Sequence, residues 1–328
     1  MPILRPPDAK DFPLSLEQLY QSVRAEISKV VFGQDEVIDF SLAALFSSGH
    51  VLLEGPPGVA KTLLVRTIAA ALNLDYRRVQ MTPDLLPNDI TGSSIFRQNT
   101  HEFEFRRGPI FANFLLADEI NRASARTQSS LLEAMQELCV THDGVTHPLP
   151  EPFIMFATQN PIEQEETYPL PLAQLDRFMF KVLVGYPDAT EEQRILREHH
   201  ATGGLSDPRK MGVQPVVSAT DILHARQTIR DTHVRDEVVA YVQKLLGATR
   251  NDDSLAVGAS PRSGLMLLMG AKSLARFSGR EFVTPDDIQA AFVPALRHRV
   301  VLSPSAELEG TTTDDVLSQL LEAVEVPR

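Results

Sequence analysis

A glycine-containing loop between a short apolar segment and a helical pattern constrains the fold more than any other feature of this chain. Residues 50–54 (HVLLE) read as a buried strand, GPPGVAKT follows at residues 55–62, and Leu64, Ile68 and Leu72 continue at helical spacing. Backbone N–H groups of such a loop, at the N-terminus of a helix, converge on phosphate oxygens. The order of strand, loop and helix therefore predicts a phosphate-binding site. The alternative is a turn that binds nothing.

Residues 55–62 match the P-loop pattern, except that alanine stands in place of its last glycine. The loop tolerates Ala60 if the φ angle of this residue is negative. Lys61 adds a mobile cation for the β- and γ-phosphates of a nucleotide, and the Thr62 hydroxyl is available to Mg²⁺. The loop residues expected to bind the nucleotide are Gly55, Pro56, Pro57, Gly58, Val59, Ala60, Lys61, Thr62 and Leu63.

Two adjacent carboxylates end a second apolar strand, FLLADE at residues 114–119. One acid can hold a metal ion while its neighbour orients water, and parallel strands deliver such side chains to the ligand-binding edge of a sheet. Asp118 is predicted to bind the nucleotide and, with Thr62, the metal. Glu119 is predicted to be the base that polarises the attacking water. Taken alone, this strand end is often only the start of a solvated loop.

Asn160 follows another expected strand, in the run ATQNP at residues 157–161. An amide at this position can hydrogen-bond both the γ-phosphate and the attacking water, so Asn160 is predicted to be catalytic. Asparagine before proline is also a common turn former. Its closeness in the sheet to the two acids favours the catalytic interpretation.

Strands alternate with helices in the first half of the chain, which predicts an α/β fold with a parallel sheet and right-handed crossovers. Nearly continuous apolar runs predict further strands at residues 76–79, 113–117, 153–158 and 179–184. Beyond residue 187 helical patterns take over, at residues 190–200, 219–231, 236–248, 261–277, 285–297 and 314–324. We therefore expect an α/β nucleotide-binding core at residues 1–187 and an all-helical domain at residues 188–328.

Composition excludes several classes of protein. The chain has 328 residues and one cysteine, Cys139, so two domains fit while a disulfide framework and a cysteine-rich zinc site do not. The net charge of −12 counts against nucleic acid as a partner. The N-terminal residues carry no apolar run typical of a signal peptide, and no run of ~18 apolar residues occurs. We expect a cytoplasmic protein that does not insert into membranes.

Five segments together resemble the AAA+ superfamily and, more narrowly, its MoxR family of ATPases, in which alanine at position 60 is usual. They are GPPGVAKT (55–62), MTPDLLPNDITGSSIF (81–96), LLADEINRASARTQSSLLEAMQE (115–137), ATQNPIEQEETYPLPLAQLDRF (157–178) and GASPRSG (258–264). The resemblance implies an AAA+ P-loop NTPase core of sheet order 5-1-4-3-2 with a C-terminal helical lid. It also implies a homo-oligomeric ring, expected to be a hexamer, that binds ATP and Mg²⁺ between its subunits.

Two arginines acquire roles from this resemblance. Arg177 matches the arginine finger that one subunit extends to the γ-phosphate held by its neighbour, and Arg262 matches the second sensor, a lid cation that touches the γ-phosphate. Without the resemblance, Arg177 would be expected in an ion pair with a nearby acid. Arg262 could then equally be a solvated charge in a first helical turn. Gln80 could hold Glu119 inactive, or be a plain loop amide. Residues 31–33 flank the adenine or form a turn.

The resemblance also places two insertions, one at about residues 84–107 and a hairpin at about residues 140–152. Alternation of Phe103 and Phe105 with glutamates, and the turn signal Asp143-Gly144, agree with both. The insertions face the ring pore or a client protein, or else are ordinary edge hairpins. The implied function is a chaperone-like ATPase that remodels or matures client proteins with von Willebrand factor A-type domains, with metal-cofactor insertion as one outcome. The competing interpretations are a chelatase or nucleic-acid motor subunit, and a nucleotide-gated scaffold with little turnover.

Overall fold

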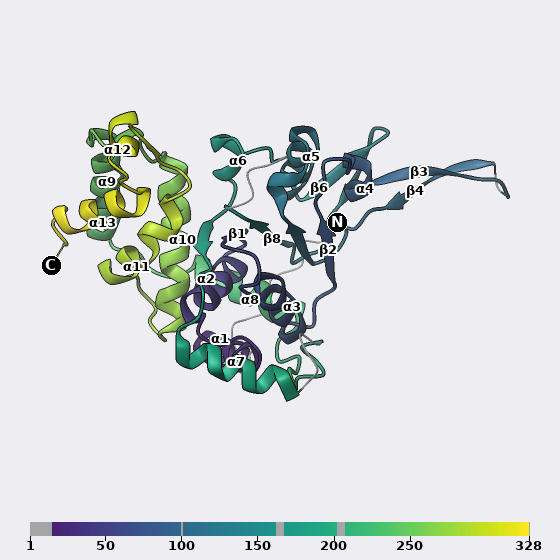
Figure 1. Ribbon diagram of the computed structural model, residues 1–328, viewed down its shortest axis with the longest axis horizontal. Helices are drawn as coiled ribbons and strands as arrows, with labels where there is room; N and C mark the ends of the chain where they lie inside the picture. The colour runs from purple at the N-terminus through teal and green to yellow at the C-terminus, as the bar shows by residue number, and fades with distance from the viewer. Residues whose placement is uncertain (1–14, 100, 162–166, 202–206, 328) are drawn as a thin grey trace.

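A five-stranded parallel sheet forms the centre of the structure, a computed structural model that describes residues 15–99, 101–161, 167–201 and 207–327 (Figure 1). Its spatial order is β2-β5-β8-β1-β9, and every neighbouring pair is parallel. Numbered along the chain, this order is 5-1-4-3-2 read from the other edge, so the predicted fold class is confirmed. The strands are β1 (Val51–Glu54), β2 (Tyr76–Gln80), β5 (Phe114–Asp118), β8 (Ile154–Gln159) and β9 (Phe180–Leu183).

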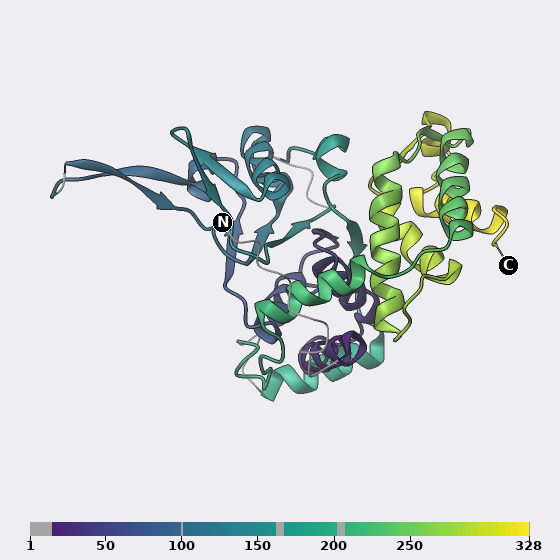
Figure 2. The ribbon, with the colours of Figure 1, turned by 180° about the vertical axis from the view of Figure 1, so that it is seen from behind.

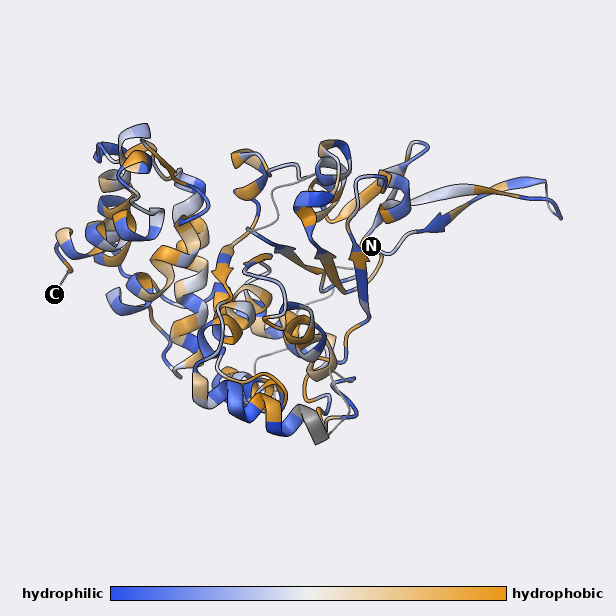
Figure 3. Ribbon diagram, viewed as in Figure 1, coloured by the Kyte–Doolittle hydropathy of each residue, from blue (hydrophilic) through white to orange (hydrophobic). Residues whose placement is uncertain are grey.

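Apolar side chains bury both faces of this sheet, as its nearly continuous apolar strands predict. Leu53 and Phe156 pack on one face with the helices α1 (Leu16–Ile27), α2 (Asp35–Phe46) and α3 (Lys61–Ala71). Leu52 and Met155 face the other way, toward α5 (Ala125–Glu137). Figure 3 shows apolar colour along the strands and polar colour on the outer sides of the helices. The sheet is therefore a rigid platform whose carboxyl edge carries the polar residues.

The C-terminal region is mostly helical, with α9 (Asp236–Asn251), α10 (Pro261–Phe277), α11 (Pro285–Leu296), α12 (Pro304–Leu308) and α13 (Thr313–Ala323). The all-helical expectation is wrong in one detail, because β10 (Leu255–Val257) and β11 (Val301–Leu302) form a short antiparallel pair. Segments of two or three residues carry no recognisable periodicity, so these strands could not be predicted from the sequence.

The helix α10 joins the two parts of the molecule, as Figure 2 shows from behind. It contacts α1, α2 and α8 (Ala219–Arg230) on one side and α9 and α11 on the other. A Cβ atom at Gly270 would lie 2.5 Å from the Phe180 ring, so only glycine permits this approach to the sheet. The Ser273 hydroxyl also shares a hydrogen bond with the hydroxyl of Ser47. The helix α7 (Ala189–Ala201) precedes α8, and the domain boundary at residues 187/188 stays a prediction.

Both predicted insertions contain hairpins. After α4 (Pro87–Thr91), the strands β3 (Gly92–Arg97) and β4 (Glu102–Arg107) pair antiparallel and extend far from the sheet (Figure 1). The second hairpin joins β6 (Cys139–His142) to β7 (Val145–Pro148) through Asp143 and Gly144, whose φ angles of 48° and 77° suit a type I′ turn. Within the described part of the chain, no helix is both long and apolar enough to cross a bilayer.

Candidate nucleotide site

The loop between β1 and α3 has the backbone geometry of a phosphate cradle. A Cβ atom at Gly55 would lie 2.1 Å from the Val184 carbonyl oxygen, so glycine is required where the loop leaves the sheet. Gly58 has a φ of +85°, and the space where its Cβ would stand is open. The loop then enters α3 at Lys61, which leaves the first N–H groups of that helix free of helical partners. The arrangement suits an anion at the helix N-terminus.

Ala60 does not meet the condition stated from the sequence, since its φ is +62° and not negative. This residue is the N-cap of α3 and adopts the left-handed conformation, in which the chain reverses from the loop into the helix. An L-residue in this conformation costs roughly 1–2 kcal/mol relative to the right-handed one. The sequence could not reveal this, because the φ angle is set by closure of the loop and not by the alanine itself.

We expect Ala60→Gly to leave the free energy of unfolding unchanged or to raise it by up to about 1 kcal/mol, because glycine relieves the left-handed strain. The matched control is Ala240→Gly, at an exposed position inside α9, which should lower the free energy of unfolding by about 1 kcal/mol. Urea denaturation measures both. An equal loss in the two variants would contradict the left-handed geometry at residue 60.

Lys61 and Thr62 lie where the P-loop pattern requires them. The Lys61 ammonium donates hydrogen bonds to the carbonyl oxygens of Gly55 and Pro56, the latter at 3.1 Å, so it lies over the loop. The Thr62 hydroxyl is 3.3 Å from the carboxylate oxygen Oδ2 of Asp118 on β5. Thr62 and Asp118, predicted separately from two segments, are thus in contact.

The two predicted acids lie at the end of β5. Asp118 is 6% exposed, and its Oδ1 accepts a hydrogen bond of 2.5 Å from the Thr158 hydroxyl on β8. Glu119 has a φ of +58°, and the strand ends at the residue before it. The Glu119 N–H donates to the same Thr158 hydroxyl at 2.8 Å. Thr158, which was not predicted from the sequence, therefore fixes both acids, and its position two residues before Asn160 was the available signal.

Three further side chains hold the acids in place. The Gln80 amide donates to Glu119 at 2.7 Å, as one of the two interpretations of Gln80 requires. Arg122 also reaches Glu119, at 3.2 Å. Arg78 pairs with Asp118 at 2.6 Å and bonds the Gln80 side-chain oxygen at 2.7 Å. Arg78 and Gln80 share a face of β2, so period-two alternation could have revealed this arginine.

The remaining predicted residues lie near this edge or on the lid side of it. Asn160 follows β8 and is 5% exposed. Arg177 is partly exposed after α6 (Leu172–Leu175), and among the described residues no carboxylate pairs with it. Arg262, in the first turn of α10, lies 3.6 Å from Asp176.

Residues 162–166 of the quoted segment 157–178 lie outside the described residues. Phe32, expected near the adenine, is buried under the Arg194 guanidinium.

The oxygens of Thr62 and Asp118 form a donor set that suits Mg²⁺. Magnesium prefers hard oxygen ligands, and it is commonly held by one or two protein groups together with substrate phosphates. The Asp118 carboxylate is buried, and its Oδ2 lies beside the Thr62 hydroxyl at the mouth of the loop. The residues present therefore fit a magnesium ion bound next to a triphosphate.

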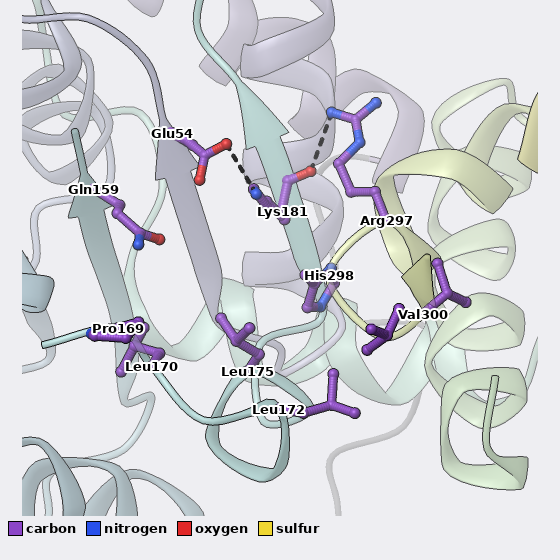
Figure 4. Close-up of a pocket in the computed structure, with 11 residues that line it drawn as sticks. Glu54, Gln159, Pro169, Leu170, Leu172, Leu175, Lys181, Arg297, His298 and Val300 are labelled. Carbon is purple, nitrogen blue, oxygen red and sulfur yellow. Dashed lines mark hydrogen bonds and ion pairs between the residues drawn. The ribbon is translucent and has the colours of Figure 1, made fainter. Parts of the chain in front are cut away.

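A cavity of about 370 Å³ lies beside the site, between the sheet and the C-terminal helices (Figure 4). Glu54 and Lys181 form an ion pair of 2.8 Å on its sheet side. The turn after α11 contributes Arg297 and His298 to the opposite wall. The cavity marks where the helical region meets the carboxyl edge of the sheet.

Comparisons with known proteins agree with this geometry. Residues 50–180 match the family described as "ATPase family associated with various cellular activities (AAA)", and residues 247–320 match the AAA lid domain. Chaperone MoxR1 of Mycobacterium tuberculosis is 43% identical over 92% of this chain and 81% of its own length. Uncharacterized protein YeaC of Bacillus subtilis is 43% identical over 92% of both chains. The crystal structure of a presumed ATPase from Cytophaga hutchinsonii has a TM-score of 0.86 and 40% identity, and the match covers 95% of this chain and 97% of that one.

The parallel sheet, the phosphate cradle and the helical lid define a P-loop protein of the AAA+ class. The chain belongs to the MoxR family of AAA+ ATPases, as the extent of its similarity to MoxR1 shows.

Proposed function

We propose that this protein is a Mg²⁺-dependent ATPase that works as a ring, taken to be a hexamer, in the cytoplasm and remodels a client protein. The observation that carries the proposal is the contact of 3.3 Å between the Thr62 hydroxyl and the buried carboxylate of Asp118, with Glu119 next to it. This contact joins the phosphate loop to the acid pair that hydrolysis needs.

Each residue has a distinct task in this proposal. Lys61 and the N–H groups of the loop bind the β- and γ-phosphates. Thr62 and Asp118 hold Mg²⁺, which neutralises charge on the phosphates when bound. Glu119 accepts the proton of the attacking water, and Asn160 orients that water toward the γ-phosphate.

Arg177 supports the shared site between subunits. Its side chain is partly exposed and has no carboxylate partner among the described residues, so its charge is available to a neighbouring subunit. A guanidinium at the γ-phosphate of the neighbour stabilises the charge of the transition state. In the same proposal, Arg262 reports the state of the γ-phosphate to the lid.

The β3–β4 hairpin supports a protein client. Ile95, Phe96 and Phe103 are 41%, 47% and 75% exposed on the projecting β3–β4 hairpin. Exposed apolar groups on a projecting element are typical of protein contacts. We propose clients or adaptors with a von Willebrand factor A-type domain, as the family resemblance implies. The net charge of −12 counts against a nucleic-acid motor.

Phosphate release at a series of protein concentrations tests this function. We expect turnover of ATP that requires Mg²⁺, that falls on dilution as subunits separate, and that added DNA or RNA leaves unchanged. Turnover that persists in a proven monomer would refute shared sites. Tight binding of ATP without any turnover would favour the scaffold.

Gln80 should restrain hydrolysis in the absence of a client, because its amide holds the Glu119 carboxylate at 2.7 Å. We expect Gln80→Ala to raise basal phosphate release about two- to tenfold, since the loss of one hydrogen bond to a charged group is worth roughly 1 kcal/mol at this exposure. Stimulation by the client should shrink correspondingly. The control is Gln289→Ala in α11, which should leave basal turnover unchanged. A basal rate that falls in Gln80→Ala would mean that Gln80 assists the base.

A further inference from the structure

The turn that follows α11 lies against the chain segment that carries Arg177. We name residues 297–299 the clamp turn and residues 176–179 the finger segment. The Nε2–H group of His298 donates to the Phe178 carbonyl oxygen at 3.0 Å. Arg297 approaches the Lys181 carbonyl oxygen at 3.4 Å, as the dashed line in Figure 4 shows. The clamp turn thus follows the backbone from the finger segment into β9.

Arg299 is the strongest element of the clamp turn. Its side chain is 1% exposed, and a charge buried to this extent is tolerated only with full hydrogen bonding. Burial lowers the pKa of Arg299 to about 10, while Asp176 opposes that shift, so the guanidinium stays charged at neutral pH. All three of its nitrogens donate.

The partners of Arg299 enclose Arg177. The Nη2 of Arg299 donates to the carbonyl oxygens of Asp176 at 3.1 Å and Phe178 at 2.6 Å, the residues directly before and after Arg177. Its Nη1 reaches the Met179 carbonyl oxygen at 3.1 Å. Its Nε pairs with the Asp176 carboxylate at 2.8 Å. A planar guanidinium therefore fixes the backbone on both sides of the proposed finger.

Asp176 connects the same segment to a second point on the lid. One of its carboxylate oxygens pairs with Arg299, and the other lies 3.6 Å from Nε of Arg262 in the first turn of α10. The side chain of Arg262 is 42% exposed, so this second pair is the weaker of the two. The finger segment is thus attached to the lid by a buried pair through Arg299 and by a longer, more exposed pair through Arg262.

We propose that Arg299 is a positioning residue for Arg177, which aligns the finger with the nucleotide site of the adjoining subunit and ties this alignment to the lid of its own subunit. The proposal rests on the proposed function, because it requires sites shared between subunits. A displacement of about 1 Å at a catalytic group can cost roughly 10²-fold in rate. If the lid shifts when nucleotide binds to its own subunit, the position of Arg177 at the site of the next subunit changes with it.

Mixed rings separate this role from a structural one. Glu119→Gln subunits keep the finger but cannot hydrolyse, whereas Arg177→Ala subunits keep the base but lack the finger. Each variant alone should be nearly inactive. Mixed one to one, they should regain up to about a quarter of wild-type activity, because half of the sites keep the base and half of those receive a finger.

Arg299→Lys is then introduced into one kind of subunit at a time. Lysine keeps the charge but cannot form the planar fork. In Glu119→Gln subunits, which supply the finger, it should lower the regained activity about 10- to 100-fold. In Arg177→Ala subunits it should change the regained activity less than about twofold, because no finger is there to misalign.

The control is Arg280→Lys, which alters a more exposed arginine–carboxylate pair with Asp287 elsewhere in the lid and should have no effect in either kind of subunit. If Arg299→Lys does not fold, as thermal unfolding will report, Asp176→Asn takes its place with the same expectations. Equal losses in both kinds of subunit, or no loss in either, would overturn the positioning role. Failure of the parent mixture to regain activity would refute the shared site itself.

Discussion

Glu119→Gln should abolish steady-state phosphate release while ATP binding persists. The substitution removes the proposed base but keeps the shape of the side chain, and loss of a general base costs about 10²–10⁴ in rate. The phosphate cradle, Lys61 and Asp118 are untouched, so the dissociation constant for ATP should change less than about threefold. Phosphate release and binding of a fluorescent ATP analogue measure the two quantities.

The matched control for this variant is Glu322→Gln, which makes the same change at an exposed position near the C-terminus of α13. It should behave as the wild type in both measurements. Wild-type turnover in Glu119→Gln would remove Glu119 from its proposed role. Loss of ATP binding together with turnover would mean that the carboxylate helps to hold the nucleotide.

The Glu119→Gln protein also offers a route to the client. A ring that binds ATP without hydrolysing it should remain in its client-bound state. Affinity purification with ATP and Mg²⁺, compared with the same protein without nucleotide, should enrich the client. A purified protein with a von Willebrand factor A-type domain would then be tested for direct binding and for an increase in wild-type turnover.

Arg177→Ala should lower turnover by about 10³–10⁵, the range that arginine fingers contribute. Binding of ATP to isolated subunits should be unaffected, because in the proposed ring the finger acts on the site of a neighbour. The control is Arg209→Ala, which removes an exposed arginine from a turn and should leave turnover unchanged. The chain that follows this turn passes the C-terminal end of α3. A loss of ATP affinity in isolated Arg177→Ala subunits would place the guanidinium in its own site and contradict the account.

The fold could be predicted from the sequence because its signals are local. The strand β1, the loop and α3 are contiguous, and the apolar runs of β5 and β8 are too short and too continuous for helices. The hairpin turn could be predicted from the two residues Asp143 and Gly144 alone. The short β10–β11 pair was missed, since segments of two or three residues show no pattern.

The site could be predicted only in part, for a reason that particular residues make clear. Thr62, Asp118 and Glu119 stand in motifs that carry their chemistry within a few residues. The contact of Arg299 with Asp176 joins residues 123 positions apart, so no local pattern could reveal it. The left-handed Ala60 belongs to the same group, because closure of the loop imposes its φ angle.

In the proposed function, a triphosphate lies in the loop at residues 55–62, and Arg177 of an adjoining subunit completes the site. The most direct measurement is an experimental structure of the Glu119→Gln protein assembled with ATP and Mg²⁺. The account predicts a closed ring in which the loop N–H groups and Lys61 contact the phosphates, and Arg177 of each subunit reaches the γ-phosphate of the next. A loop without nucleotide under saturating conditions, or an Arg177 directed away from every γ-phosphate, would contradict it.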